Sequence, residues 1–151
     1  MRLNLASGSD TDQLGVRLAA TRPQPAVLAL SGPLGAGKSS LARAMLRALG
    51  VTGAVRSPTY TLLERYPVAG GEAVHLDLYR LGAASELQFL GLDDVDAAVL
   101  WLVEWPERGV GALPAFDLRV ELAIAGEGRT AHLNALSTAG AAWIARLKGG
   151  A

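Results

Sequence analysis

The sequence predicts a single-domain α/β fold in three layers, with helices packed on a mixed sheet that contains antiparallel hairpins. An apolar segment at 26–30 is followed by a glycine-rich turn and a helical pattern at 37–49, which is typical of a strand, loop and helix unit. Two pairs of short alternating segments joined by glycines come later and predict hairpins. With 151 residues, half of them apolar, the chain is long enough for one domain with its own core.

The first elements expected are a helix, a buried strand and a second helix. Ser9 as N-cap, with a carboxylate three residues later, indicates a helix over about 10–20, and two prolines after it end it. Residues 26–30 are uniformly apolar, which predicts a buried strand. The helix expected at about 37–49 carries apolar side chains on one face, and Gly50 ends it.

Short strands are expected in the middle of the chain. Residues 59–66 and 72–79 flank a Gly-Gly turn and predict a β-hairpin. A short helix is expected at 85–90, before a glycine. The run 98–103 is apolar throughout and predicts a central, parallel strand, which Pro106 ends.

The C-terminal part of the chain predicts a second hairpin and a final helix. Apolar and polar residues alternate over 116–124, and a turn with two glycines leads into a second strand at 130–136. A helix at about 138–147 is expected to pack Trp143 and Leu147 against the core. The domain is expected to span residues 1–151.

The composition excludes several classes of protein. The chain has no cysteine, so it has no disulfides or thiolate metal sites, and we expect a cytoplasmic location. The longest apolar run, 97–103, is far too short for a membrane span, and the N-terminus lacks the apolar core of a signal peptide. Because the formal net charge is zero, non-specific affinity for nucleic acid should be weak, and any RNA is expected to be held by a partner.

Residues 32–39, Gly-Pro-Leu-Gly-Ala-Gly-Lys-Ser, match G-x-x-x-x-G-K-[ST], the phosphate-binding P-loop, in the strand and helix context that the motif requires. The glycines let the backbone wrap around a polyphosphate, Lys38 is expected to reach its terminal phosphates, and Ser39 is expected to ligate Mg²⁺. The expected fold is therefore P-loop NTPase-like. The expected nucleotide-binding residues of the loop are Gly32, Gly35, Ala36, Gly37, Lys38, Ser39 and Ser40.

ATP is the expected nucleotide. The sequence lacks the N-K-x-D element that selects guanine in GTPases, and its D-x-x-G lies on the wrong side of the P-loop. Glu104 ends an apolar strand, where an acid can complete a magnesium site because the carboxyl ends of parallel strands face the loop. His75, Asp77 and Tyr79 share one face of another expected strand. They either supply a second acid to the site or form an ordinary solvated face.

Several separate motifs together resemble one family. These are Leu-Gly-Ala-Gly-Lys-Ser at 34–39, Arg-Ser-Pro-Thr-Tyr-Thr at 56–61, His-Leu-Asp-Leu-Tyr-Arg at 75–80, Glu-Leu at 86–87 with Leu-Gly at 90–91, and Leu-Val-Glu-Trp-Pro at 102–106. In order and spacing they resemble the TsaE (YjeE) family. The resemblance implies an ATPase that supports threonylcarbamoyl modification of tRNA adenosine, acting through TsaB-like and TsaD-like proteins and touching tRNA only indirectly.

The resemblance also implies roles for individual residues. Ser39 and Glu104 correspond to magnesium ligands, and Asp77 corresponds to the essential acid near the γ-phosphate. Thr59 falls in the switch-like Ser-Pro-Thr segment and is expected to act with the catalytic residues. The cofactors that this implies are ATP and Mg²⁺.

Other positions are assigned more broadly. Thr11 and Arg129 resemble places where the family contacts its nucleotide. Pro33 is a departure, because the family usually has Asp there, and proline removes one backbone donor from the loop. Trp105 is either an adenine-stacking side chain or part of the core or of an interface.

Two other functions fit parts of the pattern. A small-molecule kinase would need an acceptor pocket and an arginine-rich lid, for which the hairpins leave little chain. A non-hydrolysing binding switch would use ATP only to order the Ser-Pro-Thr segment. Arg80 and Arg108 are each expected either to stabilise charge at the phosphates or to form surface ion pairs.

Overall fold

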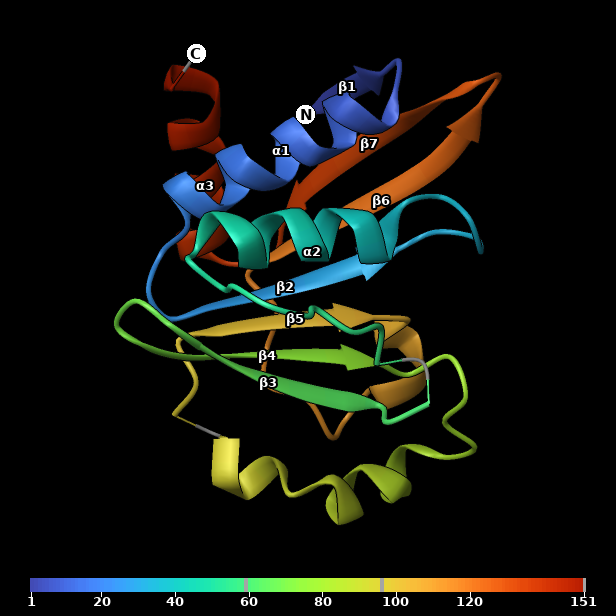
Figure 1. The fold of residues 1–151 in the computed structure, drawn as a ribbon, viewed down its shortest axis with the longest axis vertical. Helices are drawn as coiled ribbons and strands as arrows, with labels where there is room; N and C mark the ends of the chain where they lie inside the picture. Colours follow the sequence, from blue (N-terminus) through green and yellow to red (C-terminus); the bar gives the residue numbers. More distant parts are fainter. Residues whose placement is uncertain (59, 96, 151) are drawn as a thin grey trace.

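The computed structural model of the chain describes residues 1–58, 60–95 and 97–150, and it forms an α/β fold around one mixed sheet (Figure 1). The strands are β1 (Arg2–Leu5), β2 (Ala26–Ser31), β3 (Leu63–Val68), β4 (Gly71–Asp77), β5 (Leu100–Glu104), β6 (Leu118–Ala125) and β7 (Gly128–Ala135). The helices are α1 (Gly8–Thr21), α2 (Lys38–Ala48) and α3 (Thr138–Gly149), and the 3₁₀ segments are η1 (Ala84–Leu90), η2 (Leu92–Val95) and η3 (Pro106–Gly109).

The described strands lie in the order β1-β7-β6-β2-β5-β4-β3. β2 is parallel to β5 and β6, and β5 is parallel to β4, which confirms the central, parallel position expected for the apolar run before Glu104. The β3–β4 and β6–β7 pairs are antiparallel, as both predicted hairpins require. The short edge strand β1, which pairs with β7, was not predicted, because four residues are too few to show a period.

The two faces of the sheet are covered differently. The three α-helices lie on one side of the sheet (Figure 1), and together with that face of the sheet they bury the larger apolar core, which includes Leu18, Leu41 and Trp143. The other face buries a second core under η1, η2 and the loop after η3, around Leu76 and Trp101. The short helix expected at 85–90 is a 3₁₀ segment, so this outer layer contains no α-helix within the described residues.

Several element boundaries differ from the expectation by a few residues, and for two of them the hydrogen bonds give the reason. The N-cap of α1 is Ser7 and not Ser9: its hydroxyl accepts from the Asp10 N–H, and the Asp10 carboxylate accepts from the Ala6 N–H at 2.8 Å. β3 begins at Leu63 and not at 59, because the Leu62 N–H donates to the Pro58 carbonyl in a turn. No helix in the part of the chain that the structure describes has the length and apolar character needed to cross a membrane.

Candidate functional site

The glycine-rich loop lies at the edge of the sheet where β2, β4 and β5 all end. It connects β2 to α2, and the parallel pairing of these strands brings their carboxyl ends together beside it. Gly37 is the N-cap of α2 with φ of 105°, a left-handed conformation that favours glycine. At Gly32, a Cβ atom would lie 2.3 Å from the Leu122 carbonyl oxygen, so this position has no room for a side chain. Gly37 therefore allows the backbone conformation of the turn, and Gly32 allows the loop to pack against β6.

Lys38 is folded back onto the loop. Its ammonium group donates to the carbonyl oxygens of Gly32 at 2.6 Å and Pro33 at 2.9 Å, and it lies 4.6 Å from the centre of the Trp105 ring. Only 5% of Lys38 is exposed. The sequence predicts that this side chain reaches the phosphates of a nucleotide. In this structure the ammonium group instead donates to carbonyl oxygens of the loop.

Burial lowers the pKa of Lys38, because transfer out of water disfavours the charged ammonium. The carboxylates of Glu104, Asp77 and Glu107 act in the opposite direction and favour the charged form. Negative charge is therefore already arranged around the one lysine of the loop.

The two predicted acids end neighbouring strands. Asp77 of β4 and Glu104 of β5 are directly paired in the parallel register, and both are buried. The Ser39 hydroxyl donates to the Glu104 carboxylate, at 2.9 Å from Oε1 and 3.0 Å from Oε2. The Asp77 carboxylate accepts from the Tyr79 N–H at 3.0 Å. The structure thus brings Ser39, Glu104 and Asp77 together beside Lys38.

His75 belongs to the same cluster, although the sequence assigned it no separate role. Its Nε2 lies 2.6 Å from Glu104 Oε2, and only 2% of the residue is exposed. The alternative of a solvated face for His75 and Asp77 is therefore wrong, since α2 covers that face of the sheet. The two-residue alternation of β4 shows from sequence that His75 and Asp77 share a face. That His75 contacts Glu104 follows only from the pairing of β4 with β5.

Aromatic rings line one wall of the site. Trp105 has a left-handed backbone, with φ of 56°, which is uncommon for a residue with a large side chain. Its indole lies 5.0 Å from the Tyr79 ring, and the Arg108 guanidinium lies 5.5 Å from Tyr79 and 5.9 Å from Trp105. The Arg80 guanidinium lies 4.6 Å from the ring of Tyr60. Arg80 and Arg108, each expected either at the phosphates or in a surface ion pair, therefore both lie over aromatic rings, and Arg108 does so over Trp105, the ring that also contacts Lys38.

Two cavities open on opposite sides of the loop and share Gly35, Gly37 and Ser40. The first, of about 250 Å³, is lined by Leu34, Gly35, Gly37, Lys38, Ser39, Ser40, Asp77, Tyr79, Glu104 and Trp105. The second, of about 180 Å³, is lined by Ser7, Gly8, Thr11, Gly35, Ala36, Gly37, Ser40, Glu127, Gly128 and Arg129. In the second cavity the Arg129 guanidinium also donates to the Gly35 carbonyl at 3.0 Å. Thr11 and Arg129 thus lie together, away from the acids.

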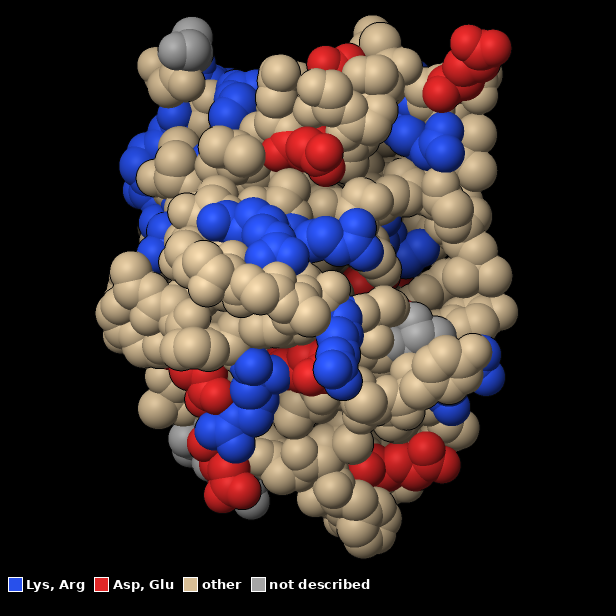
Figure 2. Space-filling view, viewed as in Figure 1, with Lys and Arg blue, Asp and Glu red and all other residues tan. Residues whose placement is uncertain are grey.

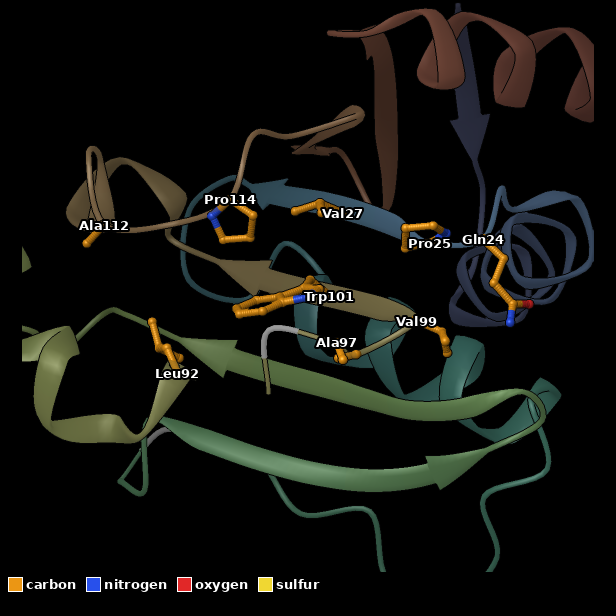
Figure 3. A pocket seen from close by; sticks show the side chains of 10 residues that line it. Gln24, Pro25, Val27, Leu92, Ala97, Val99, Trp101, Ala112 and Pro114 are labelled. Carbon is orange, nitrogen blue, oxygen red and sulfur yellow. The ribbon is translucent and has the colours of Figure 1, made fainter. Parts of the chain in front are cut away.

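A third cavity, of about 480 Å³ and so larger than these two, lies elsewhere (Figure 3). It opens near the amino ends of β2 and β5, on the other face of the sheet, and its lining includes Val27, Trp101 and Pro114. Gln24 contributes the polar side chain among its lining residues. Without converging polar groups, this cavity offers no reactive centre comparable to the loop.

Thr59 lies outside the described residues. Among the residues that are described, no group of three or more His, Cys, Asp or Glu side chains could hold a metal ion. A cation beside Ser39 and Glu104 would therefore need further oxygen ligands from a nucleotide or water, which is how Mg²⁺ is commonly bound.

Comparisons with known proteins agree on one family. The family model for "Threonylcarbamoyl adenosine biosynthesis protein TsaE" matches residues 5–131. The chain is 44% identical to the tRNA threonylcarbamoyladenosine biosynthesis protein TsaE of Haemophilus influenzae, over 74% of this chain and 71% of that protein. It is 40% identical to the protein of the same name from Streptomyces coelicolor, over 73% of this chain and 76% of that protein.

The fold comparison agrees. The crystal structure of Bacillus subtilis YdiB superposes with a TM-score of 0.80 and 26% identity, covering 99% of this chain and 95% of that chain. The matched span contains the loop, both acids and the strands that position them. The chain therefore belongs to the TsaE family of threonylcarbamoyladenosine biosynthesis proteins.

Proposed function

We propose that this chain binds ATP with Mg²⁺ and hydrolyses it to ADP and phosphate in support of threonylcarbamoyl modification of the tRNA adenosine next to the anticodon. The observation that carries the proposal is the convergence of Lys38, Ser39, Asp77 and Glu104 on one cavity beside the glycine-rich loop. Each has a function in phosphate chemistry, and two of them end adjacent parallel strands.

The loop supplies the phosphate contacts. Its N–H groups and the N-terminus of α2 favour an anion, and Lys38 would exchange the carbonyl oxygens of Gly32 and Pro33 for phosphate oxygens. That exchange favours the charged ammonium, since phosphate carries full negative charge and a carbonyl does not. Nucleotide binding should therefore release Lys38 from the loop.

The acids and the hydroxyl fit a magnesium site. Ser39 and Glu104 offer hard oxygen donors that already lie within 3.0 Å of each other. When bound, Mg²⁺ would neutralise charge on the phosphates. Asp77 is buried at the end of β4 and would orient the attacking water by accepting its hydrogen bond.

The two cavities suggest how a nucleotide divides between them. The phosphates would occupy the cavity with Lys38, and the adenosine would extend into the cavity lined by Thr11 and Arg129. This arrangement places the base away from Trp105, whose ring lies over the lysine. The adenine-stacking interpretation of Trp105 is accordingly not part of the proposal.

Coupling to partners would use segments next to the acids. These are the segments 56–61 and 75–80, of which Arg80 lies 4.6 Å from the ring of Tyr60, a residue that is 81% exposed. A partner of the TsaB and TsaD types that contacts these segments could sense the nucleotide state, as in other hydrolysis-driven switches. In the view of Figure 2, Lys and Arg side chains gather along α2, where Arg43 and Arg47 are exposed. Acidic groups are interspersed on the rest of that face, which suits indirect contact with tRNA.

The deciding experiment measures phosphate release by the chain alone, with tRNA alone and with a TsaB–TsaD pair. Slow turnover alone and a rise with the pair, together with ATP-dependent co-elution, would support the proposal. Stimulation by tRNA alone, or no stimulation and no co-elution with the pair, would contradict it. ATP-dependent co-elution without phosphate release would instead identify a non-hydrolysing switch.

A further inference from the structure

We infer that His75 is a positioning residue, which holds the Glu104 carboxylate in the orientation needed beside Ser39 for a divalent cation. This inference rests on the proposed function, because the cation would accompany a nucleotide. His75 itself would touch neither the nucleotide nor the cation.

The position of His75 in the sheet supports this role. On β4, His75 lies on the same face as Asp77 and opposes Leu102 of β5, one step deeper in the sheet than Glu104. From there its Nε2 lies 2.6 Å from Glu104 Oε2, and neither side chain is more than 3% exposed. Ser39 approaches the same carboxylate from α2, at 2.9 and 3.0 Å. The carboxylate is therefore held from two sides by two different elements.

The hydrogen bonds of the imidazole ring indicate which nitrogen carries the proton. At 2.6 Å from an oxygen of an ionised carboxylate, which can only accept, Nε2 forms a hydrogen bond only in the tautomer that carries the proton on Nε2. The other nitrogen, Nδ1, is buried and has no hydrogen-bond partner among the described residues. A donor at Nδ1 would therefore be unsatisfied, and the ring is best suited to donate once, to Glu104.

These hydrogen bonds fix the orientation of the Glu104 carboxylate. A buried carboxylate is costly unless hydrogen bonds satisfy it, and here His75 supplies one of them. Groups that hydrogen-bond to metal-ligating side chains orient them and tune their affinity for the metal. Loss of the His75 donor should therefore weaken the response to Mg²⁺ while leaving the contacts of the loop with phosphate in place. If His75 only filled the core, its loss would not weaken the response to Mg²⁺ selectively.

The test compares four variants by nucleotide binding. His75→Leu removes the donor and keeps an apolar side chain of similar size. His75→Gln can donate from a position close to Nε2, whereas His75→Asn has a shorter side chain that cannot reach Glu104. His132→Leu is the matched control, because His132 is the other histidine of the chain and is exposed on β7. Binding of a fluorescent, non-hydrolysable ATP analogue is followed in EDTA and across a Mg²⁺ titration.

We expect His75→Leu and His75→Asn to raise the Mg²⁺ concentration for half-maximal effect by about tenfold, with binding in EDTA unchanged. His75→Gln and His132→Leu should keep the wild-type midpoint. A wild-type midpoint in His75→Leu would overturn the inference, and if that variant fails to fold, equal midpoints for the Gln and Asn variants would do so. If the wild-type chain binds no nucleotide in either condition, the proposed function itself fails, and the inference fails with it.

Discussion

At the scale of single residues, the main cost in the site is the burial of charge. Lys38 is nearly inaccessible, and its ammonium group is held by two loop carbonyls and an indole ring. Burial of an ammonium group costs free energy even when it is hydrogen-bonded, which is why the pKa of Lys38 is lowered. We therefore expect the fold not to depend on this charge, whereas the proposed phosphate binding would depend on it.

We predict that Lys38→Met abolishes ATP-dependent function and leaves the fold intact. Methionine keeps most of the side-chain volume and removes the desolvated charge, so the melting temperature should change little. Nucleotide affinity should fall well beyond threefold, a free-energy change of about 0.7 kcal/mol, as measured by isothermal titration. Lys148→Met, which changes the exposed lysine of α3, is the control. An affinity within threefold of wild type would remove Lys38 from the phosphate site.

The acids give a second prediction at this scale. Glu104→Gln and Asp77→Asn should each slow phosphate release by at least about tenfold, or about 1.4 kcal/mol in the barrier. In Glu104→Gln an amide N–H₂ would face donors from Ser39 and His75, so the dependence on Mg²⁺ should change more than in Asp77→Asn. Glu121→Gln, at an exposed position on β6, is the matched control. Identical, wild-type magnesium titrations in both variants would place these acids outside the site.

At the scale of elements, the contact between α1 and α2 depends on one glycine. A Cβ atom at Gly15 would lie 2.7 Å from the Ala44 Cβ atom and 2.9 Å from the Leu41 carbonyl oxygen, too close for either. The two helices cover the face of the sheet that carries the acids, so this contact also supports the site.

We predict that Gly15→Ala lowers the free energy of unfolding by about 1–3 kcal/mol, although alanine is the better helix former. Gly149→Ala is the control, because a Cβ atom there meets nothing within 4 Å. Urea unfolding measures both variants. A Gly15→Ala variant as stable as wild type would show that the helices separate at little cost.

The elements also show what the sequence could predict. Local patterns were sufficient for the strand before the loop, the three α-helices and both hairpins, because period and capping residues are short-range signals. They did not reveal β1, nor the N-cap at Ser7, where two serines compete for one helix start. Asp77 and Glu104 were recognised as candidates. The role of His75 depends on the register of β4 beside β5, which is a long-range pairing that no local pattern contains.

At the scale of the whole molecule, the balance of positive and negative charge bears on RNA binding. The formal net charge is zero, and on the face shown in Figure 2 the basic side chains along α2 lie between areas that carry acidic side chains. Affinity for a nucleic-acid backbone rises with the number of phosphates that are neutralised, so a balanced surface should bind weakly.

We therefore predict that the chain alone binds tRNA with a dissociation constant weaker than about 10⁻⁴ M at physiological salt. Fluorescence anisotropy with labelled tRNA at two salt concentrations measures this. Micromolar binding with a steep salt dependence would contradict indirect contact and would require a basic surface for RNA.

A crystal structure with a non-hydrolysable ATP analogue and Mg²⁺ tests most directly whether both occupy the glycine-rich loop, as we propose. We expect the phosphates against residues 32–40, with Lys38 released from the carbonyls of Gly32 and Pro33. Mg²⁺ is expected at Ser39, and the adenosine is expected beside Thr11 and Arg129. A nucleotide bound in the apolar cavity beside Trp101, or no nucleotide at the loop at saturating concentration, would contradict the account.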